Sequence, residues 1–111
     1  MQPIYKALLL KMEVNMNTLA KINEKENERM MDIIEDINAL KVLVQTLSTN
    51  NELYNENSEM YEKIKNDLKA SMLAYRAAWD EIIQKYELDP EKGDNYVLNF
   101  NNRSVHYVEN Q

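Results

Sequence analysis

Residues 30–47 read MMDIIEDINALKVLVQTL, and the spacing of their apolar side chains predicts the main architecture of the chain. Six of these side chains recur at alternating steps of three and four residues, which is the 3.5-residue repeat of a coiled-coil seam. The six are Met30, Ile33, Ile37, Leu40, Val44 and Leu47. An apolar stripe of this kind must be covered, so the spacing predicts a long helix that packs on other helices through it.

The same repeat extends in both directions along the chain. Backward it runs through Leu19, Met16, Met12 and Leu9, and it is broken only by the polar residues Asn23 and Glu26. Forward it passes Asn51, Tyr54 and Ser58 and then enters an aromatic-rich half at Tyr61, Leu68, Met72, Tyr75, Trp79, Ile82 and Tyr86. No Gly or Pro occurs from residue 4 to residue 89. We therefore expect an N-terminal tail over residues 1–3 and a helical coiled-coil region over residues 4–88.

The middle of this region allows two interpretations. Residues 49–57 are rich in Asn, whose side chain competes for backbone hydrogen bonds, so they could form a loop between two antiparallel helices. In that case Asn57 or Ser58 would cap the second helix. Against a loop, the repeat keeps its register across the segment, as one continuous rod would require. The antiparallel helical hairpin is favoured because very long single helices are uncommon.

The chain beyond residue 88 is expected to leave the helical pattern. Asp89 and Pro90 are followed closely by Gly93, the only glycine, which together signal a turn. Tyr96, Leu98 and Phe100 then alternate with other residues, and a second alternating run follows an Asn-rich stretch. Residues 89–111 therefore read as a turn and a short β-hairpin. Since an isolated hairpin is marginally stable, its aromatic face should dock on the end of the helix or on a neighbouring chain.

Composition excludes several classes of function. The net charge of −6 and the scattered basic residues argue against a nucleic-acid ligand, and the absence of cysteine removes thiolate metal sites. The single histidine, His106, has no local acid or nucleophile and reads as a partly exposed strand residue. The carboxylates between Glu24 and Asp36 read as a solvated acidic face. We therefore expect no enzyme activity, no cofactor and no metal.

The location and the partners follow from the same reasoning. No apolar run approaches the roughly 20 residues that cross a bilayer, and the run at residues 7–10 is too short for a signal peptide. The cytoplasm or a virion is the expected location. Ile22, Ile34 and Leu43 widen the apolar stripe beyond a two-helix seam, so we expect a homo-oligomer that also contacts other protein subunits. The expected interface comprises the six seam residues with Tyr75, Trp79 and Phe100.

Residues 79–90 read WDEIIQKYELDP, and residues 96–100 read YVLNF. This C-terminal third resembles the tail of small phage-encoded helical proteins, in which a helix ends in a Lys-Tyr-x-Leu-Asp turn and a short hairpin follows. The resemblance implies a viral origin and assigns no functional residue. The sequence thus predicts a non-enzymatic, oligomeric coiled-coil protein that is structural or assists assembly, with a phage virion as the expected setting. The alternative is a small acidic binding protein, an inhibitor or adaptor acting on a host protein.

Overall fold

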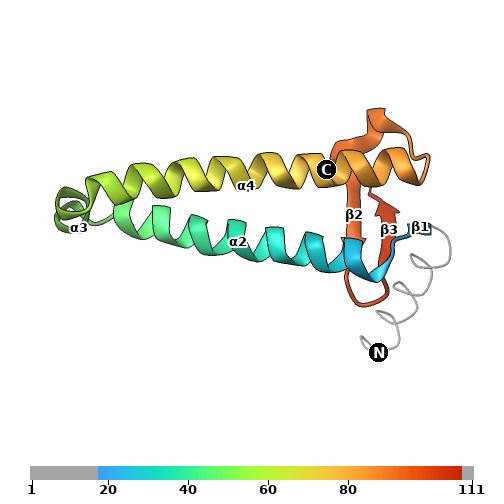
Figure 1. Ribbon diagram of the computed structural model, residues 1–111, viewed down its shortest axis with the longest axis horizontal. Helices are drawn as coiled ribbons and strands as arrows, with labels where there is room; N and C mark the ends of the chain where they lie inside the picture. Colours follow the sequence, from blue (N-terminus) through green and yellow to red (C-terminus); the bar gives the residue numbers. More distant parts are fainter. Residues whose placement is uncertain (1–17, 109–111) are drawn as a thin grey trace, which may run out of the picture. The chain divides into compact units, whose positions relative to one another are not determined.

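The computed structural model describes residues 18–108 of the chain (Figure 1). Its elements in chain order are β1 (Thr18–Lys21), α2 (Glu24–Ser48), α3 (Asn51–Glu56), α4 (Ser58–Lys85), the 3₁₀-helix η1 (Pro90–Asn95), β2 (Tyr96–Asn99) and β3 (Ser104–Tyr107). The protein is mainly helical with a small antiparallel sheet, which confirms the predicted fold class. The described residues divide into two compact units. We call residues 29–78 the helical unit, and residues 18–28 together with 79–108 the sheet unit.

Within the described residues the first long helix begins at Glu24, and residues 4–17 of the predicted helical region lie outside them. Residues 18–21 form strand β1, so the expected helix over residues 4–88 is wrong at this point. Asn23 and Glu26 explain where α2 starts. The Asn23 side chain accepts a hydrogen bond from the Glu26 N–H at 2.8 Å, and the Glu26 carboxylate accepts one from the Asn23 N–H at 2.8 Å. This reciprocal capping box places Asn23 outside the helix, where it satisfies backbone groups instead of interrupting a buried seam.

The helix is interrupted twice in the middle, so a continuous rod is wrong. Thr49 turns its hydroxyl back onto the Gln45 carbonyl at 2.9 Å, and α2 ends at Ser48. Asn50 then caps α3 by accepting a hydrogen bond from the Leu53 N–H at 3.0 Å. Asn57 separates α3 from α4. The segment expected as a loop at residues 49–57 is therefore a six-residue helix between two interruptions, each made by a side chain that bonds the backbone locally.

The C-terminal turn and hairpin lie where the sequence placed them, and the sheet gains a third strand. Asp89 caps η1 by accepting a hydrogen bond from the Glu91 N–H at 2.9 Å. Strands β2 and β3 pair antiparallel, with Val97 opposite His106 and Leu98 opposite Val105. Strand β1 adds to the other edge of β3, with a register shift between Thr18 and Ala20, so the strand order is β1-β3-β2.

The core of the sheet unit lies where the strands meet the end of α4. Trp79 and Tyr96 stack with their ring centroids 6.3 Å apart, and the Ile83 side chain lies beside Gly93. Val105 and Ile22 are 0% and 1% exposed. Full burial of such a side chain contributes about 1.5–3 kcal/mol. The hairpin thus packs on Trp79 through Tyr96, as its alternation predicted, while Phe100 is only half-buried.

Candidate interaction surface

The predicted seam is the least accessible side of α2. Met30, Ile37 and Leu47 are buried, and the other three seam residues are half-buried. Every other residue from 29 to 48 is exposed, with the exception of the half-buried Ile34. The seven-residue repeat therefore identified the packed face of this helix correctly, and that face is already partly covered within one chain.

The second long helix follows the predicted repeat at most positions and departs from it at Met72. Its least accessible positions within the helical unit again step by three and four residues, at Tyr61, Ile64, Leu68, Ser71, Tyr75 and Ala78. Met72, which the predicted repeat placed on the seam, is 51% exposed. Tyr61, Leu68 and Tyr75 therefore lie at their predicted positions, whereas Ser71 is on the packed side in place of Met72.

The nine predicted interface residues are divided between the two units. The six seam residues and the half-buried Tyr75 belong to the helical unit. Trp79 and Phe100 belong to the sheet unit, where Trp79 stacks on Tyr96 and the Phe100 carbonyl accepts a hydrogen bond from the Asn27 side chain at 3.1 Å. Trp79 is therefore a core residue of its own unit and not a free interface residue.

Several large apolar side chains of the helical unit remain exposed. Those on α2 and α4 are Met31 (38%), Val42 (61%), Leu43 (46%), Met60 (55%), Met72 (51%) and Leu73 (62%), and two more, Leu53 and Tyr54, lie on α3. Single exposed apolar residues are ordinary, but six on two long helices of a 50-residue unit leave a large share of its apolar side chains in water. Of these six, the sequence analysis identified only Leu43 as a residue beside the seam. It placed Met72 on the seam itself, and the other four, Met31, Val42, Met60 and Leu73, fall outside the predicted repeat.

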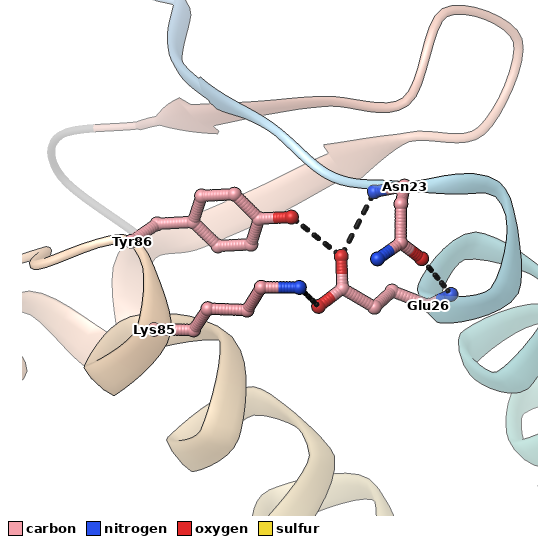
Figure 2. A network of polar contacts seen from close by, with 4 residues as sticks. All are labelled: Asn23, Glu26, Lys85 and Tyr86. Carbon is pink, nitrogen blue, oxygen red and sulfur yellow. Dashed lines mark hydrogen bonds and ion pairs between the residues drawn. The ribbon is translucent and has the colours of Figure 1, made fainter.

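A polar cluster ties the start of α2 to the end of α4 within the sheet unit (Figure 2). Around the Glu26 carboxylate, the Tyr86 hydroxyl donates a hydrogen bond at 2.5 Å and the Lys85 ammonium forms an ion pair at 2.9 Å. Partial burial raises the pKa of the Glu26 carboxyl, but the hydrogen bonds from its partners outweigh burial, and the pKa lies below its usual value of 4.5. The same contact raises the pKa of the Lys85 ammonium, and burial together with the Glu26 contact raises the pKa of the Tyr86 phenol.

This cluster is best explained as a structural clamp. Both carboxylate oxygens of Glu26 accept hydrogen bonds from groups of the same chain, Oε1 from Asn23 and Tyr86 and Oε2 from Lys85. The ion pair with Lys85 joins residues 59 positions apart in sequence. A catalytic carboxylate would need a free position for a substrate or a water molecule. From the sequence, Glu26 was identified only as a polar residue that interrupts the seam. No residue near it in the sequence indicates that Lys85 and Tyr86 contact it.

A second polar cluster lies on β3 and contains the only histidine. The Ser104 hydroxyl and His106 Nε2 are 2.7 Å apart, and the Asn102 side chain accepts a hydrogen bond from the Ser104 N–H at 3.1 Å. Ser104 and His106 are 4% and 9% exposed, so the expectation of a partly exposed histidine is wrong. A serine nucleophile needs a base that is oriented by a third group and open to a substrate. Here His106 Nδ1 has no hydrogen-bond partner among the described residues, and both side chains are buried.

Two other kinds of functional feature are absent from residues 18–108. No group of three or more His, Asp or Glu side chains in this part of the chain could hold a metal ion. Within the same range, no helix is both long enough and apolar enough to cross a bilayer. No protein-family model, no curated protein and no solved structure matches this chain. Function must therefore be argued from the surfaces of the molecule itself.

Proposed function

We propose that this protein is a non-enzymatic assembly protein whose helical unit associates with further copies of itself. The observation that carries the proposal is the set of exposed apolar side chains on α2 and α4, above all Val42, Leu43 and Leu73. Removing such side chains from water stabilises an association by about 25 cal/mol for each Å² buried. The association surface lies outside the seam, because the seam itself is already largely covered.

We infer further that α2 and α4 pair antiparallel within the helical unit. Ile37, Leu47 and Ile64 are buried, yet this unit contains only α2, α3 and α4, and no residue of α3 is buried. The two seams also complement each other in size. The α2 seam carries only large aliphatic side chains, whereas the α4 seam includes the small residues Ser71 and Ala78. Small residues on one helix let bulky side chains of its partner pack closely.

A pair of helices covers one stripe on each helix and no more. Leu43 and Met72 flank their respective seams, and Val42 and Leu73 lie farther around their helices. A helix with apolar residues this far around its circumference normally packs on more than one neighbour, as in a four-helix bundle. A second helical pair from another copy supplies those neighbours. A phage particle, the setting that the C-terminal resemblance implies, is one assembly that such a protein would serve.

The proposal is tested by measuring the mass of the protein in solution over a range of concentrations. Sedimentation velocity should show a species heavier than the 13.2 kDa chain, and Leu43→Glu combined with Leu73→Glu should return it to the monomer. Asn51→Glu combined with Asn55→Glu is the matched control, because it adds the same charge at exposed polar positions of α3, outside α2 and α4. A wild-type protein that stays monomeric at all concentrations contradicts the proposal.

One observation favours the alternative of an acidic adaptor. Asp32, Glu35 and Asp36 are exposed on α2 and form no ion pair within the described residues. Together with the net charge of −6, they could present a complementary surface to a basic protein. An adaptor of this kind would be monomeric on its own, so the sedimentation experiment above also separates the two proposals.

A further inference from the structure

The two flanks of the helical unit carry different charge. The packed residues of each helix come in pairs three residues apart, such as Ile37 and Leu40 on α2 and Leu68 and Ser71 on α4, and we call each a seam pair. One flank is formed by the residues that directly follow a seam pair. These are Ile34 and Lys41 on α2 and Lys65 and Met72 on α4. The other is formed by the residues that directly precede each pair, Asp36 and Leu43 on α2 and Asp67 and Ala74 on α4. In an antiparallel helix pair, the residues that follow the seam pairs of one helix lie on the same side as those that follow the seam pairs of the other, and the same holds for the residues that precede them. The antiparallel pairing proposed above therefore gathers each set onto one side.

The first flank is basic. Lys41 and Lys65 lie directly beside the seam, and Lys69 and Arg76 lie next outward on α4. All four are exposed, and only Lys65 has an acidic neighbour, Glu62, at 3.9 Å. The other three have no ion-pair partner among the described residues. This concentration is unusual in a chain with 19 acidic and 13 basic residues.

The second flank is acidic along α2. Asp36 lies directly beside the seam and Asp32 lies next outward, one helical turn away, and both are exposed without an ion-pair partner in the described part of the chain. Asp67 on α4 lies on the same side and is bound by Lys63 at 2.8 Å. Arg29 and Lys63 also lie on this side, so the three aspartates and two basic residues leave a net charge of −1, with Asp32 and Asp36 as the carboxylates that have no ion pair within residues 18–108.

Each flank also carries an apolar residue that a neighbouring helix would cover. Met72, on the basic flank, is 51% exposed, and Leu43, on the acidic flank, is 46% exposed. Opposite charge around an apolar contact is the arrangement that selects a partner and fixes its orientation. The acidic flank of this chain is therefore a complementary surface for its own basic flank.

We propose that copies of this chain associate side by side, with the basic flank of one copy (Lys41, Lys65, Lys69 and Arg76) on the acidic flank of the next (Asp32 and Asp36). This inference rests on the proposed assembly function and names the surfaces that carry it. Because the two contacting surfaces differ, the contact is heterologous. Repeating it yields a closed ring or an open array, whereas a two-fold dimer would join identical surfaces.

The test uses two full-length variants that each reverse one flank. Lys65→Glu with Lys69→Glu makes the basic flank acidic, and Asp32→Lys with Asp36→Lys makes the acidic flank basic. Each variant alone should self-associate about tenfold or more weakly than the wild type in sedimentation velocity, because like charges then face each other. An equimolar mixture should associate again, since the reversed flank of each variant is complementary to the reversed flank of the other.

Two controls keep the result interpretable. Glu52→Lys with Glu56→Lys makes the same charge change as the Asp32 and Asp36 variant, but on α3, outside both flanks and outside α2 and α4, and should leave association unchanged. Circular dichroism should show that all variants keep their helices, since every substituted side chain is exposed. Wild-type association should also weaken as salt is raised from about 0.05 to 0.5 M.

The outcomes separate this inference from the function on which it rests. Two variants that associate like the wild type, or a mixture that stays dissociated while each variant alone is monomeric, overturns the flank-to-flank contact and leaves assembly through the apolar residues standing. A wild type that never associates removes both. Restored association in the mixture alone supports the contact, because neither an apolar dimer nor general charge repulsion produces it.

Discussion

The sheet unit and the helical unit bury their apolar side chains to different degrees. Val105, Ile22 and Ile82 in the sheet unit are at most 3% exposed, and only Leu19 and Val97 there are large apolar residues that remain exposed. The helical unit has eight such exposed residues: Met31, Val42, Leu43, Leu53, Tyr54, Met60, Met72 and Leu73. Strands and helix ends enclose a core from several directions, whereas two long helices leave their outer sides in water.

The difference in burial separates stability from association. Substitutions in the sheet unit should change the free energy of unfolding, and substitutions at exposed apolar positions of the helical unit should change self-association. The following experiments test this separation, beginning with the largest expected effect.

Trp79→Ala should be the most destabilising of these substitutions. Trp79 is 7% exposed and stacks on Tyr96, so its removal leaves a cavity in the sheet unit. The expected loss is about 3–5 kcal/mol in the free energy of unfolding, measured by urea denaturation with circular dichroism. Leu73→Ala, at a position 62% exposed, is the comparison and should change stability by less than about 0.5 kcal/mol. Similar losses for the two variants would contradict the division between the units.

Asn23→Ala should remove the capping box of α2. The Asn23 side chain accepts the Glu26 N–H, which is otherwise unpaired at the start of the helix. The expected cost is about 0.5–2 kcal/mol of unfolding free energy, and Asn23→Ser should retain most of the stability because serine also caps helices. An Asn23→Ala protein as stable as the wild type would show that this cap is not needed.

The Glu26 clamp should make the stability of the sheet unit depend on pH. The folded pKa of Glu26 is lowered, so its contribution is present above the unfolded value of 4.5 and is lost as pH falls through the folded pKa. The raised pKa values of Tyr86 and Lys85 place a second loss above about pH 10. In thermal melts, Glu26→Gln should lower the melting temperature at pH 7 and match the wild type more closely below pH 4. An equal difference at both pH values would exclude the clamp as the cause.

Asn50→Ala should have the smallest effect on overall stability. It removes the cap of α3, a helix with no buried residue, so the expected loss is about 1 kcal/mol or less and is confined to residues 51–56. Limited proteolysis should then cut between Leu53 and Asn57 faster than in the wild type. Unchanged cleavage would mean that the two interruptions do not depend on this cap.

Much of the helical unit could be predicted from local patterns. The α2 seam was placed correctly because a seven-residue repeat reflects the geometry of one helix, which depends only on residues close in sequence. The β2–β3 hairpin was also found, since the turn residues and the alternating strands lie within a short stretch. On α4 the positions of Tyr61, Leu68 and Tyr75 were predicted correctly, whereas Met72 was wrong because the packed side runs through Ser71 there.

Only the tertiary structure revealed the third strand and the polar clusters. Residues 18–21 fit the helical repeat through Leu19, and they are a strand because β3, more than 80 residues away, offers a free edge for pairing. Glu26 gains its role from Lys85 and Tyr86, and His106 is buried beside Ser104 by the packing of the sheet unit. The sequence by itself determined the helical class, the α2 seam and the C-terminal hairpin, which depend on local spacing. Long-range pairing decided the rest, because hydrogen bonds and burial between distant segments leave no periodic signal in the chain.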